Sequence, residues 1–246
     1  MSDPILSVII PAYNEAATVV SVLEAVIAAA YVKQVIVVND GSTDGTGDIL
    51  ATWNGREGAG YRVEVVHHPM NRGKGAAIRT GVARACGQVV LVQDADLEYD
   101  PIDYPALVEP ILAREADVVY GSRYLRQDPA SPLPWTPNRA CVVLLNLMVR
   151  VLYGQRITDE ATCYKALRVE VIRALDLRCE RFEFCPEVTA KVSRMGLKIS
   201  ERPIHYRPRS YSEGKKIGWR DGIEAIATLL RWRFAPPPLI VSAAGP

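Results

Sequence analysis

The sequence predicts an α/β protein with a mostly parallel central sheet and helices on both faces. Short apolar runs alternate with helical patterns through the first half of the chain, and polar or turn-forming residues follow the runs. Such alternation is typical of strand–helix–strand units, whose crossover helices cover the sheet. The 246 residues, 49% hydrophobic and 23% charged, suffice for one substantial core and match an ordinary globular protein.

The predicted strands are short buried runs that end at a residue unsuited to continue them. The first run, 6–10, is expected to stop at Pro11, and the second, 35–38, is broken by the turn that begins at Asp40. Further strands are predicted over 63–66, 89–92 and 117–120.

Helical patterns fill the intervals between these strands. An Ala- and Val-rich stretch at 16–30 has helical periodicity, and an amphipathic stretch at 74–85 follows a glycine-rich turn. The other expected helices cover 44–50, 104–114, 140–153 and 217–234. A proline-rich loop spans 126–138, and no internal repeat or clear linker is apparent, so we expect one domain.

Charge and cysteine content limit the partners of this protein. Lysine and arginine total 29 against 28 acidic residues, which argues against a protein built to coat nucleic acid. Between 194 and 233, ten basic residues stand against four acidic ones, so anionic partners are expected at that end of the chain. Five scattered cysteines without a Cys-x-x-Cys motif indicate free thiols. Without a signal peptide or a spanning apolar run, we expect a cytoplasmic protein.

Polar residues gather where the predicted strands end. Asn14 and Glu15 follow the first strand, and Asp40 follows the second. Asp94 and Asp96 follow the strand at 89–92. Because ligands of parallel α/β sheets bind outside the carboxyl ends of the strands, this convergence indicates a binding site.

The sharpest motif is Asp94-Ala95-Asp96. Two carboxylates one residue apart at a bend can reach one hard cation, and Mn²⁺ or Mg²⁺ bridges such oxygens to phosphate. Glu98 is a candidate third ligand or a support for the other two. The same pair is also typical of a solvated acidic turn, and its position after a buried strand favours the metal site.

Three other features each have two interpretations. Gly73-Lys74-Gly75 precedes a helix, whose amides attract anions, but it lacks the P-loop pattern and equally suits a flexible turn. Asp40 is suited to accept a hydrogen bond from a base or ribose, and the residues after it suit a helix N-cap. A basic loop could close over phosphates or be an ordinary solvated loop; its cations are Arg209, Lys215 and Lys216.

Seven short motifs follow one another along nearly the whole chain. They are VIIPAYNE at 8–15, VNDGSTDGT at 38–46, NRGKG at 71–75, QDADLE at 93–98, GSRY at 121–124, DEATCYK at 159–165 and FEFCPE at 182–187. With the basic loop, they resemble the family 2 glycosyltransferases of the GT-A fold. The resemblance is strongest to the polyprenyl-phosphate branch, which includes enzymes similar to dolichol-phosphate mannosyltransferase.

The resemblance implies an inverting transfer of a hexose from a GDP- or UDP-sugar, with Mn²⁺ or Mg²⁺ as cofactor. It implies a single GT-A catalytic domain at 1–234, with a donor-binding half at 1–125, an acceptor-binding half at 126–234 and a flexible tail at 235–246. The implied donor-binding residues are Pro11, Tyr13, Glu15, Asp40, Gly73, Lys74, Asp94 and Ala95. The implied metal ligands are Asp94, Asp96 and Glu98. The implied catalytic residues are Asp96, Arg123, Asp159 and Glu187, and the phosphate-binding residues are Arg123, Arg209, Lys215 and Lys216.

The acceptor decides whether the reaction needs a base. A hydroxyl acceptor needs one, for which Glu187 and Asp159 are the candidates, whereas the oxygen of a lipid phosphate is already anionic. The cationic C-terminal part and the lack of an obvious isolated base favour a polyprenyl or dolichyl phosphate. A soluble or glycan hydroxyl acceptor, a nucleotidyltransferase and a non-catalytic nucleotide-sugar-binding module remain alternatives.

Many members of this branch carry membrane helices after the catalytic domain, whereas this sequence ends shortly after Phe234. We therefore expect either a membrane-protein partner or contact with a membrane surface through 140–153 and 217–234. Trp219, Trp232 and the neighbouring arginines suit an interfacial helix, and packing against the core is the other interpretation of both helices.

Overall fold

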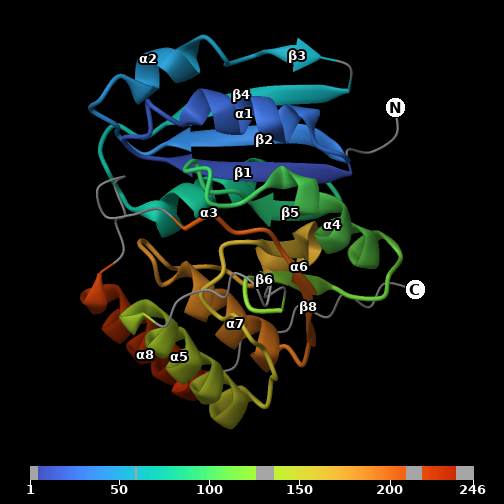
Figure 1. Cartoon of the computed structure of the whole chain (residues 1–246), viewed down its shortest axis with the longest axis vertical. Coiled ribbons are helices and arrows are strands. Elements are labelled where there is room, and N and C mark those ends of the chain that lie inside the picture. Colours follow the sequence, from blue (N-terminus) through green and yellow to red (C-terminus); the bar gives the residue numbers. More distant parts are fainter. Residues whose placement is uncertain (1–4, 59, 126–135, 209–217, 237–246) are drawn as a thin grey trace.

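A single mixed sheet runs through the computed structural model, which describes residues 5–58, 60–125, 136–208 and 218–236. Within these residues the sheet has eight strands in the order β3-β4-β2-β1-β5-β7-β6-β8 (Figure 1). Its parallel centre consists of β1 (Leu6–Ala12), β2 (Val32–Asn39), β4 (Tyr61–His67) and β5 (Val89–Val92). The expected mostly parallel sheet is confirmed.

The remaining strands place the second half of the chain in the same sheet. β7 (Lys165–Arg168) is antiparallel to β5 and to β6 (Val118–Ser122), so β5 and β6 run in the same direction. β8 (Ile199–Pro203) is parallel to β6, and β3 (Glu57–Gly58) is antiparallel to β4. The loop after β6 therefore leaves the sheet at the same edge as the loops after β1, β2 and β5.

β1 continues through Pro11, where the sequence predicted its end. Alternate residues of a strand bond to alternate neighbours, and the main-chain oxygen of Ile9 accepts from the amide of Gln93 on the β5 side. Pro11 faces the same side two residues later, beyond the last paired residue of β5, Val92. The missing N–H of proline therefore removes no ladder bond.

Helices cover both faces of the sheet. Along β1, Val8 and Ile10 enter one apolar core with α1 and α4, whereas Ile9 enters the other with α3, α6 and α7. The bounds of these helices and of the two short ones are α1 (Val19–Ala28), α2 (Thr46–Ala51), α3 (Lys74–Arg84), η1 (Pro101–Asp103), α4 (Tyr104–Leu112), α6 (Val169–Ala174) and α7 (Phe184–Arg194).

Two long helices form a separate layer beyond α7. α5 (Pro137–Tyr153) and α8 (Trp219–Phe234) lie side by side, and both pack against α7 (Figure 1). Leu145, Val149 and Leu229 are buried in a third apolar cluster between these helices. Among the described helices, none is both long enough and apolar enough to cross a membrane.

Four of the observed elements in the second half of the chain are absent from the sequence-based prediction. β7 is only four residues long, begins with Lys165 and ends with Arg168, so it lacks the apolar run of the other strands. β8 is a half-buried edge strand with a polar sequence. α6 has six residues, and α7 carries Pro186 and a buried Lys191, which mask its apolar periodicity.

Candidate active site

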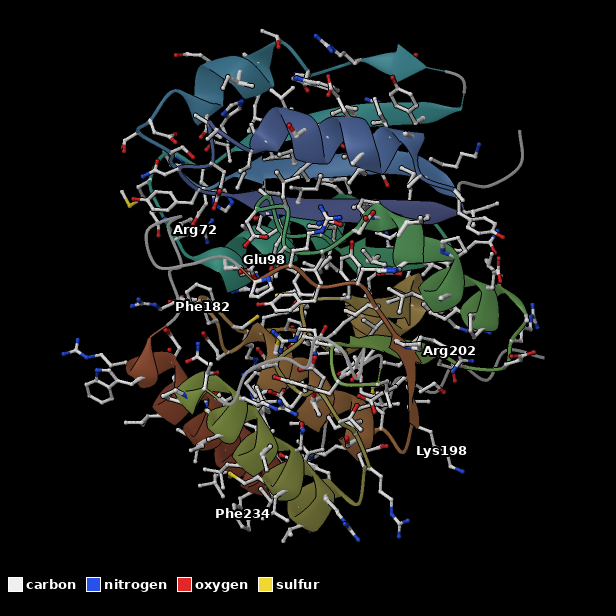
Figure 2. The ribbon with its side chains drawn as sticks, viewed as in Figure 1. Arg72, Glu98, Phe182, Lys198, Arg202 and Phe234 are labelled. Carbon is white, nitrogen blue, oxygen red and sulfur yellow. The ribbon has the colours of Figure 1, made fainter. Side chains whose placement is uncertain are left out.

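The predicted site residues of the first half lie at the carboxyl edge of the sheet. Arg72 and Glu98 lie there (Figure 2), and the ring centre of Phe182, from the segment before α7, lies 5.9 Å from Lys74 Nζ. Lys198, which contributes to the positive charge of the C-terminal part, lies well away from them (Figure 2). The excess of basic residues between 194 and 233 is thus not all directed at this edge.

The loops after β1 and β2 are joined by hydrogen bonds. The amide of Asn14 donates to Ser42 Oγ at 3.0 Å, and the amide of Thr43 donates to Asn14 Oδ1 at 2.8 Å. The amide of Glu15 donates to Thr46 Oγ1 at 3.0 Å. The motif after Asp40 therefore positions the Tyr13–Glu15 segment. Pro11, Tyr13 and Glu15 are half-buried at this edge.

Thr18 connects this pair of loops to the carboxylate motif. Its hydroxyl donates to the main-chain oxygen of Ala95 at 2.6 Å and lies 3.0 Å from Glu15 Oε2. Ala95 is buried, so it contributes main-chain atoms and not an exposed side chain. The sequence did not single out Thr18, because a threonine just before a helix has the pattern of an ordinary cap.

Asp40 is buried, and both its carboxylate oxygens are bonded within the protein. Its Oδ1 lies 2.6 Å from His68 Nδ1 and accepts from the amide of Arg72 at 2.9 Å, while Oδ2 accepts from the amide of Gly73 at 2.7 Å. His68 Nε2 lies 2.9 Å from Thr80 Oγ1 on α3. Asp40 thus holds the 68–73 loop against the sheet. That it also contacts a nucleoside stays a prediction.

The sequence left the glycine-rich turn as either a phosphate cradle or a flexible turn, and in the structure other parts of the protein bond the amides on either side of Lys74. The Gly73 amide is bonded to Asp40, and the amides of Gly75 and Ala76 donate to the main-chain oxygens of Arg181 and Glu180 at 3.0 and 3.1 Å. Gly73 has φ +93°, and a Cβ there would overlap the oxygen of Glu180. The glycines are required because another backbone segment packs directly on the start of α3.

Lys74 contributes its ammonium group to the carboxylate motif. Its Nζ lies 2.5 Å from Asp94 Oδ1 and 2.9 Å from Cys163 Sγ. Burial opposes the charge of Lys74, but the neighbouring Asp94 outweighs it and raises the pKa of the ammonium group well above its usual value. Asp94 is therefore charge-compensated by the protein itself.

Gln93 fixes the strand end from which the motif starts. Its Oε1 accepts from Tyr104 and Tyr164 hydroxyls at 2.8 and 2.6 Å, and its Nε2 donates to the main-chain oxygen of Asp94 at 2.9 Å. The two tyrosine hydroxyls leave the amide oxygen fully satisfied. Gln93 is a positioning residue that the sequence analysis quoted but did not interpret, because a buried glutamine has no distinctive spacing.

Asp96 and Glu98 form the next turn. The amide of Glu98 donates to Asp96 Oδ1 at 3.2 Å, and Leu97 between them has φ +60°. The hydroxyl of Tyr206 donates to Glu98 Oε2 at 3.3 Å, and the guanidinium of Arg123 lies 5.1 Å from the centre of the Tyr206 ring. The carboxylate turn and the loop after β6 are thus joined through one aromatic ring.

Arg123 is held by Asp159. Its Nε and Nη2 donate to the two carboxylate oxygens at 2.7 and 2.6 Å, and its amide donates to Oδ2 at 3.0 Å. Asp159 is fully buried. Burial opposes the charge of Arg123, but Asp159 outweighs it and raises the pKa of the guanidinium. The carboxylate is therefore committed to orienting a cation, and its role as a general base stays a prediction.

Glu187 is likewise occupied within the protein. Its oxygens accept from the amides of Arg178 and Cys179 at 2.8 and 2.6 Å, and Lys191 Nζ lies 2.6 Å away. It is buried and supports the segment whose Glu180 and Arg181 oxygens receive the first amides of α3. That Glu187 lies near the sugar stays a prediction. Arg209, Lys215 and Lys216 lie outside the described residues.

The residues of this edge fit a hard divalent cation that substrate oxygens help to coordinate. Among the described residues, no three His, Cys, Asp or Glu side chains converge as a metal site. Mg²⁺ is commonly held by only one or two carboxylates together with substrate phosphates. Asp94 is paired to Lys74, so Asp96 and Glu98 would be the carboxylates left to hold such a cation, and their role as metal ligands stays a prediction.

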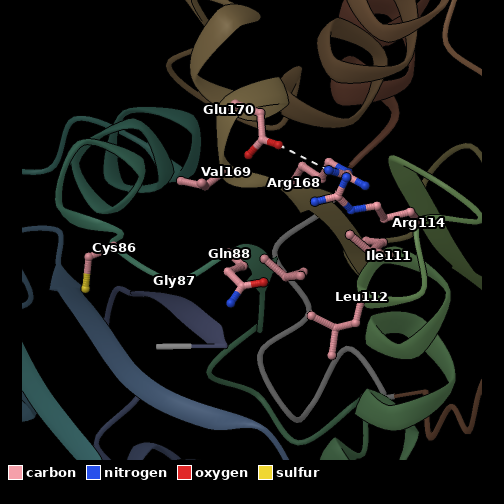
Figure 3. A pocket seen from close by; sticks show the side chains of 10 residues that line it. Cys86, Gly87, Gln88, Ile111, Leu112, Arg114, Arg168, Val169 and Glu170 are labelled. Atoms are coloured by element: carbon pink, nitrogen blue, oxygen red, sulfur yellow. Dashed lines mark hydrogen bonds and ion pairs between the residues drawn. The ribbon is translucent and has the colours of Figure 1, made fainter. Parts of the chain in front are cut away.

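A cavity of about 340 Å³ lies at the opposite edge of the sheet (Figure 3). Its lining includes Gln88 and Val89 at the amino end of β5, Leu112 at the end of α4, Arg114 just after that helix, and Glu170 of α6. Because parallel α/β sheets bind ligands at their carboxyl edge, this cavity does not belong to the site described above.

A mostly parallel sheet with a carboxylate motif at its carboxyl edge is the arrangement expected of a glycosyltransferase of the GT-A fold. The profile of "Glycosyl transferase family 2" matches residues 7–176, and the chain belongs to this family. The resemblance inferred from the motifs is thereby confirmed.

Characterised relatives cover most of the chain. An undecaprenyl-phosphate mannosyltransferase of Micrococcus luteus is 34% identical over 236 residues, which cover 92% of this chain and 93% of the relative. A dodecaprenyl-phosphate galacturonate synthase of Rhizobium johnstonii is 30% identical, covering 87% of this chain and 63% of the relative. These similarities confirm the expected polyprenyl-phosphate branch.

Among solved structures, a glucosyl-3-phosphoglycerate synthase of Mycobacterium tuberculosis shares the fold. In its complex with Mn²⁺, UDP-glucose and phosphoglyceric acid it superposes with a TM-score of 0.68 at 22% identity, covering 95% of this chain and 81% of that one. This likeness independently supports the GT-A architecture.

Proposed function

We propose that this enzyme transfers a hexose from a nucleoside-diphosphate sugar to the phosphate of a polyprenyl lipid, with inversion at the sugar. The observation that carries the proposal is the bidentate pair of Arg123 and Asp159 at the same sheet edge as Asp94 and Asp96. Asp159 occupies the Nε/Nη2 side of the guanidinium, so a phosphate would meet the N–H groups that do not contact Asp159, on a cation whose orientation is already fixed.

The occupied carboxylates also favour a phosphate over a hydroxyl. Asp159 and Glu187, which the sequence offered as bases, already accept from cations and amides of the protein. A hydroxyl acceptor would require one of them to release its partners and take a proton. A phosphate oxygen needs a cation to hold it and no base to activate it.

The proposed step is a direct displacement. An oxygen of the acceptor phosphate forms a bond to the anomeric carbon as the bond from that carbon to the donor β-phosphate breaks, and the electron pair leaves with the nucleoside diphosphate. No proton is transferred. A divalent cation, held by Asp96 and Glu98, would offset the charge of the departing diphosphate. Lys74, by compensating Asp94, reduces the negative charge that the diphosphate meets.

Two relatives are named for polyprenyl phosphates of bacterial chain lengths, and a third, of Methanococcus voltae, for a UDP-sugar and dolichyl phosphate. They support a lipid phosphate acceptor here. Such an acceptor resides in a bilayer, so the proposal also requires this protein to reach a membrane surface. We infer a peripheral location from that requirement, and its cytoplasmic side stays a prediction.

The test is a transfer assay in detergent with Mn²⁺, a panel of UDP- and GDP-sugars, and either undecaprenyl phosphate or undecaprenol as acceptor. We expect a glycolipid from undecaprenyl phosphate and none from undecaprenol. Transfer to undecaprenol, or to a soluble hydroxyl but to neither lipid, would overturn the choice of acceptor. Release of pyrophosphate from a nucleoside triphosphate and a sugar phosphate would instead identify a nucleotidyltransferase.

Two arginine variants locate the acceptor site. Arg123→Gln should lose most of the transfer to undecaprenyl phosphate while it still binds the nucleotide. Arg114→Gln is the matched control, because Arg114 lies at the opposite edge of the sheet beside the cavity (Figure 3). Equal activity of the two variants would contradict the assignment of Arg123.

A further inference from the structure

The exposed apolar side chains of this protein concentrate on two neighbouring helices. Of the twelve large hydrophobic residues that are exposed in the described chain, eight lie on α5 and α8. On α5 they are Val143, Leu144, Leu147 and Val151, and on α8 they are Trp219, Ile223, Leu230 and Phe234. We call this set the α5–α8 face.

The spacing of these residues makes each set one stripe along its helix. Val143, Leu147 and Val151 recur every four residues, which is one helical turn. The opposite side of each helix is already used, because Leu145, Val149 and Leu229 are buried between α5, α8 and α7. The exposed stripes are therefore a second apolar surface and not an extension of the core. Contiguous patches of this kind mark interaction sites.

Trp219 and Phe234 bound the α5–α8 face along α8. Trp219 is 73% exposed at the first residue of the helix, and Phe234 is 79% exposed at its last. Phe234 projects from the far end of the molecule, away from Arg72 and Glu98 (Figure 2). Aromatic residues at the ends of an amphipathic helix suit the boundary between lipid head groups and acyl chains.

The positive charge of α5 and α8 indicates which kind of surface could cover the α5–α8 face. Its two helices carry five arginines and only two acidic residues, Asp221 and Glu224. The arginines are Arg139, Arg150, Arg220, Arg231 and Arg233. A second copy of the same face would bring like charges together, whereas an anionic lipid surface complements them.

The α5–α8 face is connected to the candidate active site through α7. Both α5 and α8 pack against α7, and the segment just before α7 supplies the oxygen of Arg181 that accepts from the amide of Gly75 at the start of α3. The face therefore belongs to the same packed unit as the segment that supports Lys74. Neither α5 nor α8 is long and apolar enough to span a bilayer, so they would lie along it.

We propose that the α5–α8 face docks this protein on an anionic phospholipid bilayer. The inference deepens the proposed function and rests on it, because docking delivers the active site to a phosphate that is anchored in the same bilayer. The apolar stripes insert among the acyl chains, and the arginines contact the phosphate groups of the lipids.

The test is co-sedimentation of the full chain with vesicles of phosphatidylcholine, with or without phosphatidylglycerol. We expect binding to the vesicles that contain phosphatidylglycerol and weaker binding at high salt. Leu147→Gln combined with Val151→Gln should reduce the partition coefficient about tenfold or more, because burial of each side chain is lost. Ile102→Gln is the matched control, since Ile102 is 68% exposed but lies in η1, outside the face.

Three outcomes would overturn the docking inference. They are no vesicle binding by the wild type, equal binding by the double variant, and a wild-type dimer that the double variant converts to a monomer in the absence of lipid. The detergent transfer assay separates this inference from the proposed function. Transfer in detergent without vesicle binding would reject docking alone, and vesicle binding without transfer to any lipid phosphate would reject the proposed function.

Discussion

Arg123 and Asp159 form a closed fork, in which both carboxylate oxygens accept from the guanidinium at 2.6 and 2.7 Å and one also accepts from the Arg123 amide. The pair joins the end of β6 to the segment before β7. It therefore fixes the direction of the arginine before any substrate arrives. A preorganised cation binds an anion at a lower entropic cost than a flexible one.

Asp159→Asn should show whether Asp159 orients Arg123 or acts as a general base. We expect a fall of about tenfold or more in kcat/KM for the acceptor phosphate, with nucleotide binding unchanged, because the guanidinium loses its charged partner. Breaking the buried pair should also lower the free energy of unfolding by about 3–5 kcal/mol. Steady-state kinetics with each substrate varied, together with urea unfolding, measure both effects.

Arg123→Lys is the companion variant, because it keeps the charge and removes the fork. If Asp159 orients Arg123, both variants should weaken acceptor use and leave the shape of the pH–rate profile as in the wild type. Loss of the acidic limb of the profile in Asp159→Asn alone would show that Asp159 takes a proton, and the acceptor would then be a hydroxyl.

Asp96→Asn should abolish the metal-dependent part of nucleotide binding. In the wild type, the nucleoside diphosphate that matches the donor should raise the melting temperature more with Mn²⁺ than without it, by mass action on the native state. Without the Asp96 carboxylate the added effect of Mn²⁺ should vanish, while the metal-free shift remains. Differential scanning fluorimetry with UDP and GDP measures this.

Asp176→Asn controls for the loss of a negative charge, because Asp176 is an exposed residue beside Arg178. It should retain the full Mn²⁺ effect. A persistent Mn²⁺ effect in Asp96→Asn would place the metal elsewhere, and the interpretation of the carboxylate motif would be wrong.

Motifs at strand ends were predictable because topology alone brings them together. Asp40, Asp94 and Asp96 follow parallel strands, so any parallel arrangement of those strands places them on one edge. What each carboxylate contacts was not predictable. Asp40 and Glu187 each accept from two main-chain amides besides a side-chain partner, and amides have no sequence signature. The second half was predicted least well, since β7 and α7 are defined by packing against the first half.

The same limit explains the glycine-rich turn. The sequence left open whether its amides bind phosphate or belong to a flexible turn, and the oxygens that accept from them belong to Glu180 and Arg181, more than 100 residues later in the chain. Only the folded structure shows that the segment before α7 packs on the start of α3. Cys163, which contacts Lys74, is likewise brought to the site by β7 and not by local sequence.

Gly73→Ala should be strongly destabilising. The residue has φ +93°, and its Cβ would overlap the main-chain oxygen of Glu180, which cannot move without displacing the segment over α3. We expect a loss of about 2 kcal/mol or more in the free energy of unfolding, from backbone strain and steric overlap together. Denaturant unfolding measures it, and nucleotide affinity should fall with it because Lys74 follows directly.

Gly154→Ala measures the cost of backbone strain in the absence of steric overlap. Gly154 ends α5 with φ +73°, and no described atom lies within 4 Å of the position of its Cβ. It should cost only about 1 kcal/mol, and nucleotide binding should be unchanged. If the two variants lose equal free energy of unfolding, the steric overlap with Glu180 adds nothing to the destabilisation by Gly73→Ala.

Glu160 should make the protein less stable as the pH rises. It is fully buried beside Thr189, and burial, partly opposed by Lys165, raises its pKa to about 8. The unfolded chain gives up this proton near its ordinary pKa of 4.5, whereas the native state keeps it. The stabilisation is therefore complete below pH 4.5, declines as the pH rises, and is lost above about pH 8.

Glu160→Gln removes the titratable carboxyl group and keeps the shape of the side chain. Between pH 5 and pH 7.5, the free energy of unfolding of the wild type should fall relative to that of the variant by on the order of 1 kcal/mol per pH unit. Urea unfolding across this range measures the difference, and Glu57→Gln, on the exposed edge strand β3, should follow the wild type. Parallel curves for wild type and Glu160→Gln would show that the buried carboxyl keeps an ordinary pKa, and that Lys165 compensates its charge in the native state.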